Sequence, residues 1–373
     1  MDALILTCGT GGGHNAAAYA MEEELNNRGH HTVVLNPYTL KSDRLASIID
    51  HCYIRIAQKL PKLFGLIYRA GMLYNKLPVR SPVYHVNKTM MERMKTYLSQ
   101  HHFDVIVMTH LFPAEILTNL KDHGTPIPPC LFIATDYTCI PFCGEIDCDF
   151  YVIPSKDLTR EFSSQGIAPH TIYPLGIPTR SAFHRNMDKI QIKKGLKLSL
   201  EKNYIFISGG SMGAGKLIHA IRKVLSHYAN DSSIEIIVLC GNNISLYRKL
   251  KRLYKNRVIP LKHTEHVAEY MVACEAVITK PGGLTSTEAA VCNSRLIHIS
   301  PIPGCETKNA HFFSKNGLSI FVPSMKELIP AIEHLQKDAT YRRMKKQQNR
   351  YINKFAASDI CELIERHINE DIT

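Results

Sequence analysis

The sequence lacks tryptophan, and it lacks any apolar run of the length that crosses a membrane. A membrane-spanning helix needs about 18 or more consecutive apolar residues, so we do not expect this chain to span a bilayer. The first nine residues carry no basic n-region, and their apolar stretch is too short for a signal peptide. We therefore predict a protein that stays in the cytoplasm.

Signals for disulfides and metals are also missing. The 11 cysteines show no secreted-type framework, and most lie inside apolar runs, where cysteine acts as a small hydrophobe. Cys139, Cys143 and Cys148 cluster without C-x-x-C spacing and without a histidine pair, which argues against zinc. We predict no metal and no cofactor.

Acidic residues are in short supply. The chain has 33 Asp and Glu against 45 Lys and Arg, a net charge of +12. Between Lys41 and Lys95 there are 11 basic and 3 acidic residues. A nucleotide, a nucleic acid or an anionic membrane would each suit such a charge. Because the chain has no aromatic-and-basic recognition motif, we predict that it does not bind nucleic acid.

The basic region also contains a candidate membrane segment. Residues 53–76 are apolar around most of a helical wheel, with a break at Pro61, and Lys62, Arg69 and Lys76 form one basic stripe. Such a segment is typical of a helix that lies in an anionic membrane surface. The alternative is a helix that is buried on one side and has a solvated basic edge. We predict membrane contact through about residues 41–95.

The chain alternates strands and helices, as in parallel α/β sheets. Residues 174–178 form a proline-bounded linker, after which the pattern restarts. The expected strands are 3–7, 32–35, 104–109, 130–134, 150–154, 203–208, 234–240, 258–261, 276–279, 295–299 and 319–322. This pattern predicts an α/β fold of two doubly wound, Rossmann-like lobes, residues 1–175 and 176–349, with a cleft between them. The C-terminal helix, about 350–373, would pack back on the first lobe.

A glycine loop, Gly9 to Gly13, follows the first strand and ends at His14. Its spacing is not that of a dinucleotide site, strand two has no acid to hold a ribose, and no Gly-Lys-Ser/Thr of a P-loop follows. The alternative is a tight turn without further function. The positive end of a helix dipole favours a neutral imidazole, so His14 is a candidate general base.

A second loop, Lys280 to Glu288, joins a strand to a helix in the second lobe. Backbone N–H groups of Gly282 and Gly283 and the Thr285 hydroxyl could cradle a diphosphate. A carboxylate one turn further on, that of Glu288, could accept both hydroxyls of a ribose. The alternative interpretation is purely structural: Thr285 is the N-cap of this helix.

Two more loops complete the set. Gly209, Gly210 and Ser211 form a glycine turn on a neighbouring strand of the same lobe, and two anion-binding loops in one lobe indicate a nucleotide diphosphate. Glu306 and Asn309 follow a rigid proline loop, and a carboxylate and an amide three residues apart can bind the vicinal hydroxyls of a sugar.

Together these motifs resemble glycosyltransferase family 28. The similarity is closest to its glycolipid-forming branch, the monogalactosyldiacylglycerol synthases and processive diacylglycerol glucosyltransferases, over roughly residues 3–365. The resemblance implies a GT-B fold, inversion at the anomeric carbon and no structural metal.

Asp147-Cys-Asp149 matches the D-x-D metal motif of another glycosyltransferase fold, but it precedes a first-lobe strand, away from the nucleotide loops.

The resemblance also implies roles for single residues. His14 would be the base, with Asp136 as a second catalytic candidate. The UDP-sugar would contact Arg180, Gly209, Gly210, Ser211, Gly282, Gly283, Leu284, Thr285, Glu288, Glu306 and Asn309. The acceptor would contact Gly12, Gly13 and His110.

The resulting hypothesis is a peripheral enzyme at the inner face of the cell membrane. It would move a hexose from a UDP-sugar to a lipid hydroxyl, that of diacylglycerol. One alternative is an enzyme that uses UDP-N-acetylglucosamine, either a lipid-II-type transferase or a 2-epimerase. A non-enzymatic alternative is a basic nucleotide- or nucleic-acid-binding protein.

Overall fold

The computed structural model describes residues 1–75, 77–186, 188–210 and 217–372. The chain forms two compact units. Unit 1 comprises residues 1–181, 303–305 and 353–373, and unit 2 comprises residues 182–302 and 306–352. The second unit is therefore inserted between the body of the first unit and its C-terminal segment.

Unit 1 is a parallel sheet of six strands in the order β2-β1-β3-β4-β5-β6. Its strands are β1 (Asp2–Leu6), β2 (His31–Leu35), β3 (Val105–Met108), β4 (Cys130–Ile133), β5 (Phe150–Val152) and β6 (Ile172–Tyr173). Its α-helices are α1 (Gly12–Asn27), α2 (Asp43–Lys59), α3 (Pro61–Tyr74), α4 (Pro82–Lys88), α5 (Met91–Gln100), α6 (Leu111–Asp122), α7 (Thr159–Ser163) and α16 (Ala356–Ile372). The 3-10 turns are Pro37–Leu40, Lys156–Leu158 and Pro169–Thr171.

Unit 2 repeats this architecture with the strand order β12-β11-β10-β7-β8-β9, again all parallel. Its strands are β7 (Asn203–Ser208), β8 (Ile234–Leu239), β9 (Val258–Leu261), β10 (Ala276–Thr279), β11 (Leu296–Ile299) and β12 (Ile320–Val322). Its helices are α8 (Lys189–Gly195), α9 (Leu217–His227), α10 (Ile244–Leu253), α11 (Val267–Ala273), α12 (Gly283–Val291), α13 (Cys305–Lys315), α14 (Leu328–Gln336) and α15 (Asp338–Tyr351). Short 3-10 turns occupy Ser181–Phe183, at the start of this unit, and Met325–Glu327.

The predicted α/β fold is confirmed, with two doubly wound parallel sheets. The sequence predicts every one of these strands to within two residues, except β6. That strand has only two residues, too few for a periodic hydrophobic signal.

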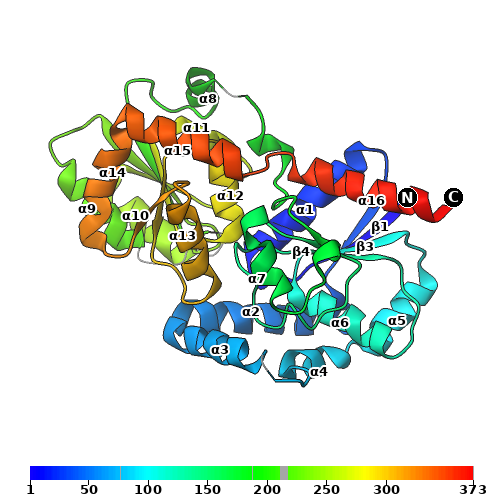
Figure 1. The fold of residues 1–373 in the computed structure, drawn as a ribbon. Coiled ribbons are helices and arrows are strands. Elements are labelled where there is room, and N and C mark those ends of the chain that lie inside the picture. Colours follow the sequence, from blue (N-terminus) through cyan, green and yellow to red (C-terminus); the bar gives the residue numbers. More distant parts are fainter. Residues whose placement is uncertain (76, 187, 211–216, 373) are drawn as a thin grey trace. The chain divides into compact units, whose positions relative to one another are not determined.

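The core of unit 1 includes residues from both ends of the chain. Buried side chains of α1, such as Met21 and Leu25, pack with Ile360 and Ile364 of α16 and with the strands. Figure 1 shows α16, in red, beside α1, in blue. Arg28, which follows α1, also donates hydrogen bonds to Glu365 and Ser358 on α16. The C-terminal helix is therefore an integral part of unit 1.

The predicted break at Pro61 is confirmed, because α2 ends at Lys59 and Pro61 is the first residue of α3. Proline fits the first helical turn, where its missing N–H costs no hydrogen bond. No helix in the described part of the chain is long and apolar enough to cross a membrane.

Candidate functional site

His14 lies in the first turn of α1, which begins at Gly12 directly after the glycine loop. Its Nδ1 is 2.9 Å from the carbonyl oxygen of Thr109 and 2.8 Å from Oγ1 of Thr135. Because a carbonyl oxygen can only accept, the hydrogen of the neutral ring is on Nδ1 and the lone pair is on Nε2. The imidazole is thus in the tautomer that can take up a proton at Nε2.

The charge state of His14 also suits a base. Desolvation lowers the pKa of the imidazole, while the Asp136 carboxylate and the hydrogen bond to Thr109 act in the opposite direction. Asp136 follows β4 immediately after Thr135, at the carboxyl end of the sheet. The structure therefore brings the two predicted catalytic residues close enough for their charges to interact. The sequence does not predict Thr109 and Thr135, because residues that hydrogen-bond to a catalytic side chain have no sequence signature of their own.

His110 has a different environment. It is buried, and its Nδ1 accepts a hydrogen bond from the backbone N–H of Phe112, at the start of α6. Its Nε2 therefore carries the hydrogen and lies 2.9 Å from Oγ1 of Thr10, in the glycine loop. Both ring nitrogens thus hold the loop against α6. The predicted contact between His110 and the acceptor stays a prediction.

The glycine loop is anchored by a residue that sequence reasoning missed. Asp50 of α2 accepts a hydrogen bond from the backbone N–H of Gly9. A Cβ placed on Gly9 would lie only 2.3 Å from Asp50 Oδ2, so a larger residue would displace the carboxylate. A Cβ on Gly11, in contrast, would meet open space. The loop is therefore fixed at its first glycine and accessible at Gly11, beside the predicted acceptor residues Gly12 and Gly13.

Arg180 lies in unit 1, after the linker 174–178. Its Nε is buried, and within the described residues it has no hydrogen-bond partner. A guanidinium N–H without a partner is suited to bind an anion.

The donor residues predicted in unit 2 lie where β10 leads into α12. The N-cap of α12 is Gly282, so the reading in which Thr285 caps the helix is wrong, and Thr285 lies in the first turn instead. Gly283 and Leu284 are buried at the same helix start. Glu288, a turn and a half along α12, is also buried. No side chain of the described residues caps the start of α12, and the uncapped backbone N–H groups at a helix start favour an anion.

The other loop of unit 2 follows β7. Gly210 adopts a left-handed conformation with φ of 70°, which glycine tolerates better than other residues. Its N–H donates to Oγ of Ser208, and Gly209 is buried. Ser211 lies outside the described residues.

The two predicted sugar-binding side chains are tied to the β10–α12 loop. Glu306 forms an ion pair with Lys280 and accepts a hydrogen bond of 2.8 Å from the backbone N–H of Ile302. Asn309 donates to the carbonyl oxygen of Pro281 at 3.0 Å. Lys280 was not among the predicted site residues.

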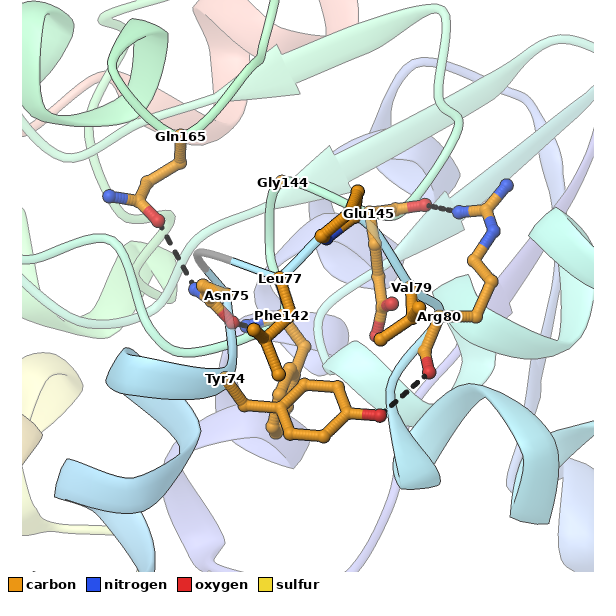
Figure 2. A pocket seen from close by; sticks show the side chains of 10 residues that line it. Tyr74, Asn75, Leu77, Val79, Arg80, Phe142, Gly144, Glu145 and Gln165 are labelled. Carbon is orange, nitrogen blue, oxygen red and sulfur yellow. Dashed lines mark hydrogen bonds between the residues drawn. The ribbon is translucent and has the colours of Figure 1, made fainter.

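Unit 1 also contains a pocket of about 340 Å³ at the end of α3. Figure 2 shows its walls, in which Asn75 donates to Gln165 and the Tyr74 hydroxyl to the carbonyl oxygen of Arg80. Phe142 and the apolar residue Val79 also line it. No pattern in the sequence predicts this pocket.

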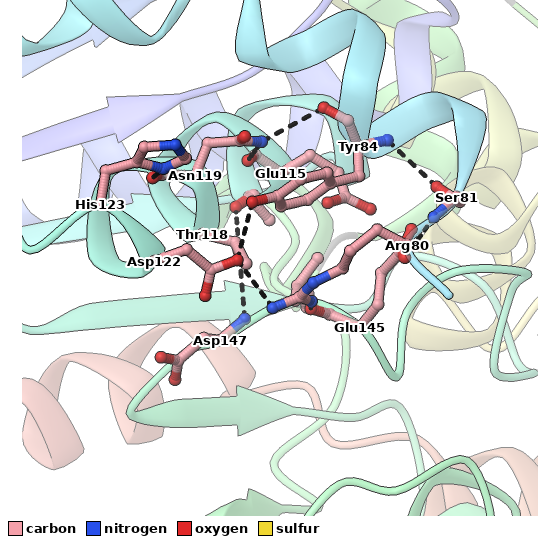
Figure 3. Close-up of polar contacts among 12 residues, drawn as sticks. Arg80, Ser81, Tyr84, Glu115, Thr118, Asn119, Asp122, His123, Glu145 and Asp147 are labelled. Carbon is pink, nitrogen blue, oxygen red and sulfur yellow. Dashed lines mark hydrogen bonds and ion pairs between the residues drawn. The ribbon is translucent and has the colours of Figure 1, made fainter. Parts of the chain in front are cut away.

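A polar network lies next to that pocket (Figure 3). Arg80 donates to the backbone oxygen of Glu145 and, at 2.7 Å, to Asp122. Glu145 accepts a hydrogen bond from the N–H of Ser81. Glu115 is completely buried next to Glu145, and its protonated carboxyl can donate a hydrogen bond to the Glu145 carboxylate. Burial, with a contribution from Glu145, raises the pKa of Glu115 to about 10, so this side chain is a neutral acid at pH 7.

The two carboxylates of the D-x-D match, those of Asp147 and Asp149, form ion pairs with a nearby lysine. Lys121 of α6 lies 3.7 Å from Asp147 and 3.2 Å from Asp149. No three His, Cys, Asp or Glu side chains gather to hold a metal ion anywhere in the portion of the chain that the structure describes.

Family models match both halves of the chain. Residues 14–179 match monogalactosyldiacylglycerol (MGDG) synthase, and residues 204–364 match the glycosyltransferase family 28 C-terminal domain. The chain belongs to glycosyltransferase family 28. It is therefore a glycosyltransferase, and its two sheets form the GT-B fold, as the resemblance to this family implies.

Individual relatives agree with this assignment. The chain is 28% identical to the processive diacylglycerol beta-glucosyltransferase of Bacillus pumilus over 342 residues, 90% of this chain and 86% of that protein. Among solved structures, MurG of Acinetobacter baumannii has a TM-score of 0.60 at 15% identity, covering 98% and 99% of the two chains. The UDP-GlcNAc 2-epimerase of Neisseria meningitidis, bound to UDP-GlcNAc, has a TM-score of 0.61 at 11% identity, covering 98% and 100%. At these identities the two structures show the fold alone.

Proposed function

We propose that this family 28 enzyme transfers a hexose from a UDP-sugar to the free hydroxyl of diacylglycerol, with inversion at the anomeric carbon. The observation that carries the proposal is the similarity, over nine-tenths of the chain, to enzymes named as processive diacylglycerol beta-glucosyltransferases. The tautomer of His14 supports it, because an acceptor hydroxyl needs a base.

The proposed reaction is a direct displacement. His14 Nε2 takes the proton of the acceptor hydroxyl, whose oxygen forms a bond to C1 of the sugar. The bond between C1 and the diphosphate oxygen breaks, and UDP leaves with the electron pair. Asp136 stabilises the imidazolium that forms, since its charge already favours that state in the free enzyme.

In this proposal unit 2 binds the donor. Gly209, Gly210, Gly282, Gly283, Leu284 and Thr285 surround the diphosphate, Glu288 binds the ribose, and Glu306 and Asn309 lie at the hexose. The buried start of α12 supports these roles, because its N–H groups and its dipole favour a diphosphate. Arg180, with its unpartnered Nε, adds positive charge for the leaving group. Unit 1 binds the acceptor through Gly12 and Gly13.

We also propose that α2 and α3 contact an anionic membrane surface on the inner face of the cell membrane. Several large apolar side chains of α3 point outward, among them Leu66 and Leu73, which are 63% and 65% exposed. The inner side of α3 has glycines instead: a Cβ on Gly71 would lie 3.0 Å from Pro141 Cβ. The close contact at Gly71 is on the inner side of α3, and the outward leucines are available to enter the acyl region.

The charges next to these leucines support the same surface. Lys59, Lys62 and Arg69 are exposed on the same two helices. Lys76, the third cation of the predicted stripe, lies outside the described residues. Two aromatic residues of α3, Phe64 and Tyr74, are partly buried instead, and Phe64 packs against Tyr53.

The deciding experiment supplies UDP-glucose, UDP-galactose and UDP-N-acetylglucosamine in separate reactions, with diacylglycerol in anionic vesicles. Mass spectrometry then resolves the lipid products, and NMR gives the anomeric configuration. We expect a β-linked hexosyl-diacylglycerol, and the productive donor identifies the hexose. Conversion of UDP-N-acetylglucosamine without a lipid product, or retention of the α configuration, would refute the proposal.

A further inference from the structure

The side chain of Lys280 extends from the β10–α12 loop to Gly210, in the loop that follows β7. A Cβ placed on Gly210 would lie 3.0 Å from Lys280 Cε and 3.8 Å from its Nζ. On the other side, a Cβ placed on Gly282 would lie 4.0 Å from Oε1 of Glu306, the oxygen that pairs with Nζ. Glycine at position 210 lets the loop after β7 approach the end of this lysine closely, whereas a Cβ at position 282 would make only an ordinary contact.

The charge is held in place and largely shielded from water. The side chains of Lys280 and Glu306 are 13% and 8% exposed. Glu306 is itself fixed, since its Oε2 accepts the N–H of Ile302. An ammonium group has three N–H donors, and the pair with Glu306 uses one of them. Because a long, flexible lysine normally extends into water, this anchoring keeps the charge at the loops.

We propose that Lys280 binds the diphosphate of the donor and neutralises the charge that develops as UDP leaves, and that Glu306 positions its ammonium group. This inference rests on the proposed use of a UDP-sugar. The start of α12 supplies neutral backbone N–H donors, which orient a diphosphate. Lys280 supplies a full positive charge at the same place, where burial strengthens its attraction for an anion.

The test compares two ligands that differ only in the diphosphate. The affinities of the full-length enzyme for UDP and for uridine are measured by calorimetry and by ligand-observed NMR. We expect Lys280→Met to weaken UDP binding by about 10- to 100-fold, the effect of losing a charged hydrogen bond. Uridine affinity should stay within about twofold, and Lys280→Arg, which keeps the charge, should restore part of the UDP affinity.

A second variant tests the role of Glu306. Glu306→Gln keeps the shape and an oxygen for the N–H of Ile302 but removes the charge that balances Lys280. We expect UDP to bind several-fold more tightly, because the uncompensated ammonium gains a partner. Lys189→Met is the matched control, since Lys189 pairs with Glu275 in the same unit and should leave UDP affinity unchanged.

The outcomes separate this inference from the proposed function. Equal UDP affinity in wild type and Lys280→Met, or an equal loss for UDP and uridine, would overturn the inference and leave the proposed function standing. Weaker UDP binding in Glu306→Gln would overturn the positioning role. Failure of the wild-type enzyme to bind UDP would refute the proposed function itself.

Discussion

Glu115 should make the stability of this enzyme depend on pH in a way that a single substitution removes. In the folded chain the pKa of Glu115 is raised from 4.5 to about 10, chiefly by burial, whereas in the unfolded chain the carboxyl ionises near 4.5. The folded state therefore retains a proton that the unfolded state loses. The resulting contribution to stability is fully present below about pH 4.5 and declines as pH rises towards 10.

The size of the effect follows from linkage. Each pH unit within this window costs about 1.4 kcal/mol of unfolding free energy, so the cost at pH 7.5, three units above 4.5, is about 4 kcal/mol. Glu115→Gln has the shape of the neutral acid and cannot ionise in the unfolded state. Its amide can also donate to Glu145, as the protonated acid can. We therefore expect the variant to be about 4 kcal/mol more stable than wild type at pH 7.5 and nearly equal to it near pH 4.5.

The measurement is guanidinium denaturation of both proteins at several pH values from 4.5 to 8.5. The two curves of unfolding free energy against pH should converge at the acid end and diverge above it. Glu92→Gln, at an exposed position on α5, is the control and should run parallel to wild type. If the Glu115→Gln curve also ran parallel to wild type, Glu115 would not be a neutral acid in the folded enzyme.

Four further predictions follow from the same structure. His14→Ala should lower turnover by about 100-fold or more while UDP affinity is unchanged; an equal loss of both would argue against the role as base. Glu288→Ala should weaken UDP binding in calorimetry, and unchanged affinity would contradict the ribose contact. The double variant Leu66→Glu and Leu73→Glu should bind anionic vesicles about 100-fold or more weakly in co-sedimentation, since each leucine buried in the membrane contributes about 1.5–3 kcal/mol. Leu253→Glu, on α10, is the control. Equal vesicle binding by the double variant and the control would exclude α3 as the contact surface. Ile360→Ala should destabilise unit 1 by about 2–5 kcal/mol through loss of core packing, whereas Phe355→Ala, at an exposed position nearby, should change the unfolding midpoint little.

Patterns along the chain were sufficient to predict most of the fold. Buried parallel strands are short apolar runs with turn residues at their ends, and runs such as Ile234–Leu239 are recognisable without any tertiary information. The glycine loops were found for the same reason, because each follows a strand and opens a helix. The break before α3 was predictable because Pro61 cannot continue a helix.

Contacts between distant residues could not be predicted. Thr109 fixes the tautomer of His14 from 95 residues away, and Asp50 anchors Gly9 from another helix. In the sequence, Glu115 is one more polar position on α6, and only packing shows that it is completely buried beside Glu145. The error at Thr285 has a local cause: the turn donates the N–H of Gly282 to the oxygen of Lys280, so α12 starts earlier than the hydroxyl pattern indicates.

The insertion of unit 2 within unit 1 has a consequence for biosynthesis. Residues 182–302 and 306–352 leave the ribosome before α16 does, although the hydrophobic core of unit 1 needs Ile360 and Ile364 from that helix. Unit 2 can therefore complete its packing first, whereas the core of unit 1 stays incomplete until α16 has been synthesised. A stop codon shortly after residue 352 would leave the sheet of unit 2 intact and the sheet of unit 1 with an open apolar face, the form of nascent protein that chaperones and proteases recognise.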